Sequence, residues 1–434
     1  MEIAKPIENL TASPFEVASG LRELRAPGIV FLDSNAASAR NDLSIVTAFP
    51  VKSLHGHLRS AEDVSLLRAA LNEVRPTSSR PDTGFPSAGL FGAVDFHGSF
   101  EFGLYERILV FDHPNDQWLD SGGFMERNGI DTEALVSPSL MSAPQVEFKA
   151  HKSREWFVDA VQRAQEYIAA GDIYQVNLAH AFRAAWPKGA DPIAFYSTLR
   201  EVSPAPFAAY LDFGTRQVLS ASPESFLKLS GNVVSTSPIK GTRPRYRDRE
   251  RDEKSAYDLL TSPKEVAELI MITDLERNDL GRVCEFGSVQ VTDLLKIERF
   301  EHVFHLVSTV NGQLRPDVDH LAALQACFPG GSITGAPKKR ATEILEELED
   351  TPRGLYTGSI GYLGANGESQ FNIAIRTAVV EHDVIHFHVG AGIVADSDPE
   401  MEHEETLHKA AGILLAAERS TEIRGAVLKS QSRR

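Results

Sequence analysis

Strand-like segments in this chain come in groups, before and between the helix-like segments, rather than one strand to each helix. Apolar runs bounded by turn residues predict strands at 28–33 and 103–111, and strands and turns alternate again up to about residue 245. A parallel α/β sheet would instead require regular strand–helix alternation, so this order favours an α+β fold. Turn-rich stretches at 72–87 and 112–145 predict an exposed loop and a surface excursion.

Three helices can be placed by their end signals. The first begins at Ser153, has apolar residues at helical spacing, and ends at Gly171. The second begins with the capping-box sequence Ser262–Glu265, which has a proline at the first helical position. The third repeats this start at Ser397–Glu400 and continues with apolar residues to Leu415.

Composition limits the compartment and the partners that we expect. The 434 residues carry a net charge of −16, which argues against a nucleic-acid partner or an anionic membrane surface. The two cysteines, Cys284 and Cys327, are too few for a disulfide framework and indicate a reducing compartment. The sequence has neither an apolar leader segment nor a run of about 18 apolar residues. We therefore expect a soluble, cytoplasmic protein with no nucleic-acid and no membrane partner.

Lys240 lies in the segment Pro238–Arg245, directly before Gly241 and Thr242. The neighbouring glycine leaves room for the lysine amine to approach a ligand, and an unprotonated lysine amine is a nucleophile in enzymes. The arginines at 243–251 are interleaved with acidic residues, which favours a solvated surface loop instead. Taken alone, Lys240 fits the surface interpretation better, so other parts of the chain must decide.

Two pairs of glutamates are spaced so that each pair shares one helix face: Glu265 with Glu268, and Glu402 with Glu405. Two such helices facing each other would form an all-oxygen site suited to Mg²⁺. A plainer role stays open for two of them, because Glu265 occupies a capping-box position and Glu405 precedes Lys409 by four residues, the spacing of a surface ion pair. Neither role is available to Glu268.

The glycine-rich segment 328–339 is similar to a phosphate-binding loop only at first sight. A Walker A loop requires Gly-Lys-Ser/Thr, whereas Ala336, Pro337 and Lys338 follow Gly335. This excludes nucleotide hydrolysis and leaves a glycine-rich turn that positions substrate or neighbouring backbone.

Three further stretches could bind an anion. The apolar–polar alternation at 372–377 predicts a strand that presents Arg376 as a carboxylate clamp. Gly390-Ala391-Gly392 follows an apolar strand and could offer backbone N–H groups. Tyr356 could donate from its hydroxyl, and His305, taken alone, is more often a structural histidine than a catalyst.

Together these segments resemble the chorismate-utilising enzyme family, which includes anthranilate, aminodeoxychorismate, isochorismate and salicylate synthases. The resemblance is dense over about 150–420, weak over the first 140 residues, and rests on motifs in the same order: 171–178, 222–224, 238–245, 274–283, 328–338, 354–363, 371–377 and 390–409. It implies an α+β fold with two packed antiparallel β-sheets, flanked by helices, and the active site between the two halves. It also implies an N-terminal part of the fold at 1–145, a chorismate-binding catalytic region at 146–425 and a polar C-terminal tail at 426–434.

Lys240 indicates which branch of the family the chain resembles. Anthranilate synthases look like Pro-Ile-Ala-Gly-Thr at this point, whereas the aminodeoxychorismate branch carries the Pro-Ile-Lys-Gly-Thr found at 238–242. A lysine amine can attack C2 of chorismate with loss of the C4 hydroxyl, after which ammonia attacks C4 and expels the lysine. The resemblance thus implies aminodeoxychorismate synthase component I activity, which yields 4-amino-4-deoxychorismate for 4-aminobenzoate and folate synthesis.

The resemblance also implies a role for each matching residue. Lys240 would be the covalent nucleophile, Glu224 the general acid and His305 a further catalytic residue. Mg²⁺ would be held by four glutamates, the two direct ligands being given first: Glu268, Glu405, Glu265 and Glu402. The other matches would surround the substrate: Gly241, Thr242, Tyr356, Arg376, Gly390, Ala391, Gly392 and Lys409.

The family's tryptophan effector pocket would correspond to Phe31–Ser34 and to Pro206, Phe207 and Ala208. Ser34 matches the inhibitor-binding pattern and the rest departs from it. We therefore do not expect feedback inhibition by tryptophan, whereas a structural role for bound tryptophan stays open.

The chain contains no Gly-x-Cys-x-Gly nucleophile elbow, so ammonia would come from a separate glutamine amidotransferase subunit, and a separate lyase would complete 4-aminobenzoate formation. The first alternative is anthranilate synthase component I, against which Lys240 argues. An isochorismate or salicylate synthase is a further alternative. A non-catalytic scaffold of the same fold is disfavoured because Glu224, Lys240, Glu268, Arg376 and Glu405 are all present.

Overall fold

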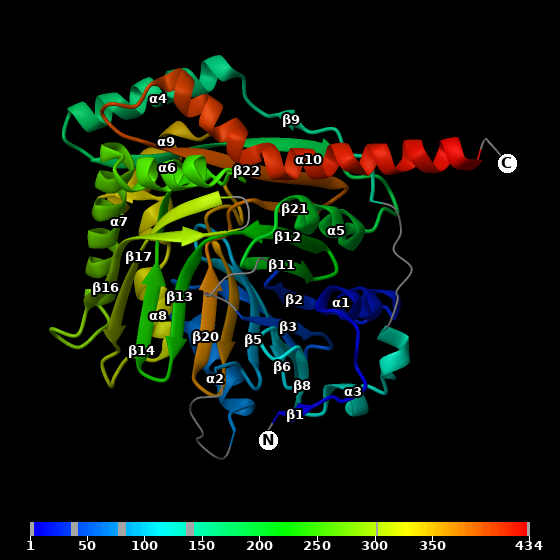
Figure 1. The fold of residues 1–434 in the computed structure, drawn as a ribbon. Helices are drawn as coiled ribbons and strands as arrows, with labels where there is room; N and C mark the ends of the chain where they lie inside the picture. Colours follow the sequence, from blue (N-terminus) through cyan, green and yellow to red (C-terminus); the bar gives the residue numbers. More distant parts are fainter. Residues whose placement is uncertain (1–3, 36–41, 77–83, 136–142, 301–302, 432–434) are drawn as a thin grey trace.

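Two antiparallel β-sheets pack against each other and form the centre of the protein (Figure 1). The computed structural model describes residues 4–35, 42–76, 84–135, 143–300 and 303–431. Within these residues, the first sheet has twelve strands and the second has ten.

The first sheet has the spatial order β1 (Lys5–Pro6), β8 (Gln117–Ser121), β7 (Ile108–Asp112), β3 (Leu43–Thr47), β2 (Val30–Asp33), β11 (Phe207–Asp212), β12 (Arg216–Ser222), β21 (Thr377–Glu381), β22 (Val384–Ile393), β10 (Gln175–Ala185) and β18 (Gly335–Ala336), with β9 (Lys149–Ala150) beside β10. The second sheet has the order β15 (Ile239–Pro244), β17 (Val303–Gln313), β14 (Val233–Ser237), β13 (Ser225–Ser230), β20 (Glu368–Asn372), β19 (Ser359–Gly364), β5 (Gly89–Val94), β6 (Ser99–Tyr105) and β4 (Lys52–His57), with β16 (Gln290–Arg299) beside β17. The helical segments are α1 (Pro14–Glu23), α2 (Ala61–Glu73), α3 (Phe124–Arg127), η1 (Thr132–Leu135), α4 (Arg154–Ala169), α5 (Pro192–Val202), α6 (Arg249–Leu260), α7 (Pro263–Gly281), α8 (His320–Cys327), η2 (Gly331–Ile333), α9 (Lys338–Leu348) and α10 (Pro399–Gln431).

The core lies between the sheets and under the helices that cover them. Val30 and Val218 of the first sheet meet Phe91 and Tyr362 of the second in one buried cluster. Phe31, one residue after Val30, points to the opposite face and packs in a second cluster with residues of α1, α5 and α10. Strands that are buried on both faces read as continuous apolar runs, as the segment at 28–33 does. The α+β class and the two packed antiparallel sheets predicted from the sequence are confirmed.

The N-terminal third corrects two sequence predictions. The single strand predicted at 103–111 is divided at Glu106 and Arg107, so that β6 belongs to the second sheet and β7 to the first. The predicted surface excursion at 112–145 contributes β8 to the first sheet, and its Trp118 is 2% exposed and donates to the Ala12 carbonyl. Buried aromatic anchors therefore outweigh the turn-rich composition of that segment. Within the predicted loop at 72–87, residues 77–83 lie outside the described residues.

The predicted helix starts are confirmed, but two of the caps differ from the prediction. The Ser153 hydroxyl caps α4 by accepting from the backbone N–H of the third helical residue, as a capping serine does. The helix α7 begins at Pro263, yet Ser262 makes no side-chain cap hydrogen bond, so the expected capping box does not form. At α10 the capping side chain is Asp398, which accepts from the N–H groups of Glu400 and Met401.

Cys284 and Cys327 are both buried free thiols. None of the helices in the described part of the chain combines the length and the apolarity needed to cross a lipid bilayer.

Candidate active site

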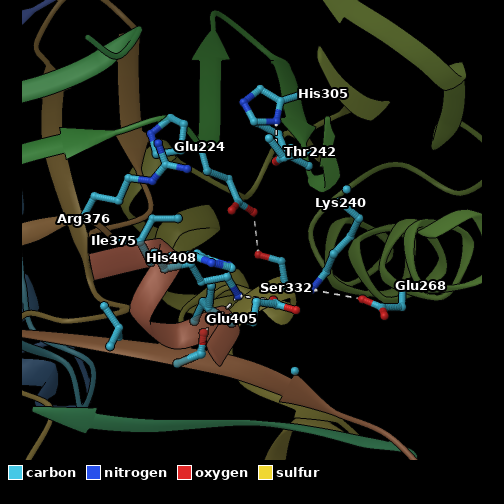
Figure 2. Close-up of a pocket in the computed structure, with 18 of the residues that line it drawn as sticks. Glu224, Lys240, Thr242, Glu268, His305, Ser332, Ile375, Arg376, Glu405 and His408 are labelled. Atoms are coloured by element: carbon cyan, nitrogen blue, oxygen red, sulfur yellow. Dashed lines mark hydrogen bonds and ion pairs between the residues drawn. The ribbon is translucent and has the colours of Figure 1, made fainter. Parts of the chain in front are cut away.

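A cavity of about 530 Å³ opens where β15 and α7 face β22 and the start of α10 (Figure 2). Every residue that we predicted for catalysis, substrate binding or metal binding lines this cavity, with the exception of Ala391. Segments that are far apart in the sequence thus meet at one place, between the two halves of the fold. Of the residues not predicted, Lys264, Ser332, His388 and His408 also line the cavity.

Lys240 is positioned by an irregularity in β15. The pairing of β15 with β17 shifts register between Lys240 and Thr242, and Gly241 between them has φ +72°. A β-bulge of this kind re-aims the neighbouring side chain, and glycine adopts a positive φ without strain. The Lys240 side chain is 18% exposed, and its Nζ lies 3.8 Å from Glu268 Oε2. The surface-loop interpretation of Lys240 is therefore wrong.

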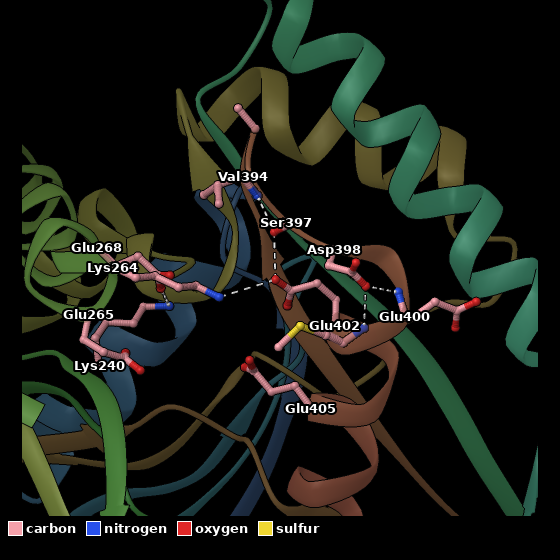
Figure 3. Close-up of polar contacts among 12 residues, drawn as sticks. Lys240, Lys264, Glu265, Glu268, Val394, Ser397, Asp398, Glu400, Glu402 and Glu405 are labelled. Carbon is pink, nitrogen blue, oxygen red and sulfur yellow. Dashed lines mark hydrogen bonds and ion pairs between the residues drawn. The ribbon is translucent and has the colours of Figure 1, made fainter. Parts of the chain in front are cut away.

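Four glutamates face the cavity from two helices, Glu265 and Glu268 from α7 and Glu402 and Glu405 from α10 (Figure 3). Glu265 is not used in a capping box and lies with its Oε1 3.8 Å from an Arg243 guanidinium nitrogen. Glu402 is 3% exposed and accepts a hydrogen bond of 2.7 Å from the Ser397 hydroxyl.

Lysine amines lie against these carboxylates. Lys264 Nζ is 3.6 Å from Glu402 Oε1, and Lys409 Nζ is 2.7 Å from Glu405 Oε1, which confirms the ion pair expected from the spacing. Burial raises the pKa of Glu402, since a buried carboxylate loses its hydration. Burial opposes ionisation of Glu405 too, but Lys409, together with Lys264 and Lys240, outweighs burial, so the pKa of Glu405 is lowered.

Burial also raises the pKa of Glu268, although Lys240 and Lys264 act in the opposite direction. The four glutamates therefore bring negative charges close together, and the neighbouring lysines only partly neutralise them. Among the described residues, no three acidic, histidine or cysteine side chains are grouped closely enough to hold a metal ion as they stand. The donor set is nevertheless all carboxylate oxygen on facing helices, which fits Mg²⁺ in chemistry, and a bound cation would replace the lysine contacts.

Arg376 does not lie in a strand as predicted. β20 ends at Asn372 and β21 begins at Thr377, and Arg376 adopts φ +49° in the connection between them. The apolar residues of this connection, Ile373 and Ala374, pack in two different buried clusters. Their burial produces an apolar pattern similar to that of a strand. The Arg376 guanidinium has no carboxylate partner within the described part of the chain, and burial lowers its pKa. A half-buried, unpaired cation in a cavity is suited to bind a carboxylate.

Two hydrogen bonds connect further site residues. The Ser332 hydroxyl of η2 donates to Glu224 Oε1 at 2.7 Å, and Glu224 is 7% exposed. Thr242 Oγ1 lies 3.0 Å from His305 Nδ1, so the histidine has a local structural partner as well as a place in the cavity wall. Ser332 belongs to the glycine-rich segment, which was the signal in the sequence that could have identified it.

The Gly390-Ala391-Gly392 segment continues β22 rather than following it. Its residues pair with Asn177, Leu178 and Ala179 of β10, whereas pairing with β21 stops at Phe387. The edge of β22 beyond Phe387 thus faces the cavity, where the Gly390 carbonyl accepts from Lys409 Nζ at 3.0 Å. Ala391 is buried in the core and does not line the cavity, so its predicted contact with substrate would have to come from its backbone.

Small residues and one tyrosine shape the wall beside this edge. A side-chain carbon at Gly392 would lie 3.8 Å from Lys240 Nζ, and one at Gly390 would lie 2.8 Å from the Tyr356 hydroxyl. Burial raises the pKa of Tyr356 to about 12, so its hydroxyl stays protonated and can donate.

The residues predicted for an effector pocket come together at a separate place. β2 and β11 pair with Ala208 opposite Asp33, which brings Ser34 beside Pro206 and Phe207. Asp33 is 1% exposed and is paired with Arg200 at 2.8 Å. The structure thus joins the two stretches, with an internal ion pair next to Ser34.

The chain matches the profile of the chorismate binding enzyme family over residues 91–415. It is 41% identical to aminodeoxychorismate synthase component 1 of Bacillus subtilis over 74% of this chain and 71% of that protein. It is 48% identical to anthranilate synthase component 1 of Thermus thermophilus over 65% of this chain and 60% of that protein. Among solved structures, that of anthranilate synthase component I from Streptococcus pneumoniae superimposes with a TM-score of 0.75 and 29% identity, covering 95% of this chain and 100% of the other.

Proposed function

Because the chain belongs to the chorismate-binding enzyme family, we propose that it aminates chorismate at C4, as an aminodeoxychorismate synthase component 1. The observation that carries this proposal is the Lys240 amine, which lies inside the cavity next to the glutamates and beside Gly392. This position supports a role for the amine as a nucleophile rather than as a surface charge.

The proposed reaction has two displacements, in which the Lys240 amine acts first as nucleophile and then as leaving group. Unprotonated Lys240 Nζ attacks C2 of chorismate, both ring double bonds shift (C1=C2 to C1=C6 and C5=C6 to C4=C5), and the C4 hydroxyl leaves as water with a proton from Glu224. Ammonia then attacks C4, both ring double bonds shift back, and the protonated Lys240 nitrogen leaves C2 as a free amine. Glu224 is within hydrogen-bond reach of Ser332 and lines the same cavity as Lys240, which suits it to the role of general acid.

Arg376 and the glycine edge of β22 would hold substrate carboxylates, and Tyr356 would donate a hydrogen bond to the substrate. When bound at Glu268 and Glu405, Mg²⁺ would neutralise the carboxylates of the site and the charge of the substrate. A separate amidotransferase subunit would supply the ammonia. The names of the relatives support this proposal, because each is a component 1 and so belongs with a further component.

A second candidate is anthranilate synthase component 1, which adds nitrogen at C2 and releases the aromatic product. The observation that favours it is the 48% identity to such a protein over 65% of this chain. The two candidates differ in the ring carbon that receives nitrogen, so the product decides between them.

The deciding experiment incubates the purified chain with chorismate, Mg²⁺ and ammonium, and identifies the product by mass spectrometry and fluorescence. We expect the mass of 4-amino-4-deoxychorismate and no fluorescent anthranilate. Anthranilate as the main product would overturn the proposal in favour of the second candidate. Glutamine in place of ammonium should give no product until a glutamine amidotransferase subunit is added.

The metal is tested by titrating Mg²⁺ into chelator-treated protein and following chorismate binding by thermal shift, which does not depend on turnover. Mg²⁺ should strengthen chorismate binding in the wild type and not in Glu268→Gln. Asp274→Asn is the matched control, because Asp274 lies on the same helix, is 76% exposed and pairs only with Arg277 among the described residues. An equal response of both variants to Mg²⁺ would remove Glu268 from the metal site.

A further inference from the structure

The second half of α7 contains two buried charged groups that face the segment 328–337 and that the proposed reaction does not use. Glu276 and Asp279 lie on α7, one turn apart, and each is 3% exposed. Ionisable side chains are rarely buried to this degree without a specific partner. Within the described residues, their side-chain hydrogen bonds go to Gly331 of this segment and to Lys338, the residue that follows it.

Lys338, at the start of α9, forms an ion pair with Asp279 and donates to the Cys327 carbonyl at 2.9 Å. It thereby ties the two ends of the segment 328–337 to α7. Glu276 holds the middle of the segment, because its Oε1 accepts from the Gly331 backbone N–H at 3.2 Å. The segment is therefore fixed to α7 at two points, Gly331 and Lys338, and Lys338 also joins its two ends.

The contact at Gly331 is close and leaves no room for a side chain. A carbon added to Gly331 would lie 2.5 Å from Leu275 Cδ2 and 3.2 Å from Glu276 Oε1. Gly331 begins η2, and the next residue is Ser332, whose hydroxyl donates to Glu224. The buried chain of contacts runs from Glu276 through the Gly331 amide and Ser332 to Glu224.

We propose that Glu276 is a positioning residue for the reaction, which anchors η2 so that the Ser332 hydroxyl is held against the general acid Glu224. The inference rests on the proposed role of Glu224 and extends it to a residue outside the cavity wall. Glu276 touches neither substrate nor metal and acts through the turn.

Glu276 also affects Glu224 through its charge. The ionisable groups that face it are Asp279 on α7, Lys338 on α9 and Glu224 across the turn. Burial, and next Asp279, raise the pKa of Glu276 to about 7. Once Glu276 is ionised, its negative charge favours the protonated form of Glu224, which is the form that a general acid requires.

The test compares Glu276→Ala, Glu276→Gln, Ser332→Ala and the double variant Glu276→Ala/Ser332→Ala by the rate of chorismate consumption with ammonium and Mg²⁺. Glu276→Ala should lower kcat by about tenfold, with a much smaller change in KM, since a hydrogen bond to a charged group is lost. The double variant should be no slower than the slower single variant, because both changes break the same chain of contacts.

Glu276→Gln keeps an oxygen acceptor for the Gly331 amide and removes the charge. It should restore most of kcat below pH 7 and move the alkaline limb of the kcat/KM profile to lower pH. Asp274→Ala, an exposed carboxylate two residues away on α7, is the control that should behave like the wild type.

A wild-type kcat in a folded Glu276→Ala protein, or effects that multiply in the double variant, would overturn the proposal. If Glu276→Ala does not fold, Glu276→Gln decides, and an alkaline limb that coincides with that of the wild type overturns it. Consumption of chorismate is measured whatever the product is, so a failure of the proposed function appears in the product and not in these rates.

Discussion

Three lysine amines in the active-site cavity each lie near a different glutamate: Lys240 near Glu268, Lys264 near Glu402 and Lys409 near Glu405. Only Lys240 extends from a strand, at a bulge, whereas the other two extend from the helices that carry the glutamates. A lysine on its own element can approach a ligand from a different side than the carboxylates do. Attack requires the neutral amine, so the contact with Glu268 must be given up before the reaction.

Replacement of Lys240 tests its role directly. Lys240→Ala should lower formation of the C4-aminated product by about a hundredfold or more, because no other nucleophile replaces the amine. Ammonia that still reaches C2 should then give anthranilate-type product. Product composition is measured by mass spectrometry and fluorescence, with Lys254→Ala, an exposed lysine of α6, as the control. A Lys240→Ala enzyme that makes the C4-aminated product at the wild-type rate would exclude covalent catalysis by Lys240.

Glu276 also predicts a pH dependence of stability. Its pKa is raised from 4.5 to about 7 in the folded protein, so its contribution to stability is fully present below pH 4.5 and is lost as the pH rises through 7. Glu276→Gln cannot ionise and should gain about 3 kcal/mol on the wild type between pH 5 and pH 8. For a chain of this size that corresponds to about 3 °C in Tm. Thermal melts at both pH values, with Asp274→Asn as control, measure this difference, and a constant offset would contradict it.

The principal site residues could be predicted from the sequence, because few residue types can serve as nucleophile, magnesium ligand or carboxylate clamp. Lys240, Glu268 and Arg376 therefore stood out in the sequence, even though the charged loop around Lys240 favoured a surface position. Ser332 lay in a glycine-rich segment that marked its neighbourhood but not its contact with Glu224, and Glu276 did not stand out because its contact between α7 and η2 leaves no local pattern. The side chain of Ala391 does not reach the cavity, because a strand continues through the glycines on either side of it.

At the level of single elements, β15 illustrates how backbone geometry places a functional side chain. Its register with β17 shifts at Gly241, where φ is +72°. A side-chain carbon at Gly241 would lie 2.7 Å from Leu259 Cδ1 and 2.9 Å from Glu265 Oε2. The glycine therefore permits both the bulge and the close approach of α6 and α7 to the strand.

Gly241→Ala should destabilise the protein and slow the reaction together. The positive φ alone costs about 1–2 kcal/mol for alanine, and the contacts with Leu259 and Glu265 add to this cost. Gly189→Ala is the matched control, because Gly189 has φ +76° with open space around it. We expect a larger loss of Tm for Gly241→Ala and at least about a tenfold loss of kcat, with wild-type kcat for Gly189→Ala. Equal effects of the two changes would show that the bulge does not position Lys240.

Element boundaries were predicted well where a local signal and the packing agree. Ser153 and Gly171 mark the ends of α4 because a capping hydroxyl and a glycine at φ +83° act within a few residues. The capping box at Ser262 failed because Glu265 is drawn toward the cavity and Gly241 instead of folding back on its own helix. The strand predicted at 372–377 is absent for a similar reason, since tertiary packing imitates its pattern: Ile373 and Ile375 pack in one buried cluster and Ala374 in another.

At the scale of the whole molecule, residues 1–145 supply strands to both sheets. β2 pairs with β11 in the first sheet, and β5 pairs with β19 in the second. The cluster between the sheets includes Val30 and Phe91 from this part of the chain. Such long-range pairings leave little trace in local sequence, which is why the strand at 103–111 was predicted as one unit when its halves belong to different sheets.

The interleaved sheets predict that the catalytic region does not fold alone. A fragment of residues 146–434 would expose the edges of β11 and β19 and lose part of the core between the sheets. We expect it to show no cooperative thermal transition and no chorismate binding, and co-expression with residues 1–145 should restore both. Removal of residues 426–434 alone is the control and should leave Tm within about 2 °C of the full chain. A fragment 146–434 that melts cooperatively and binds chorismate would make residues 1–145 an independent unit, and the strand pairing between the two parts would then be dispensable for the site.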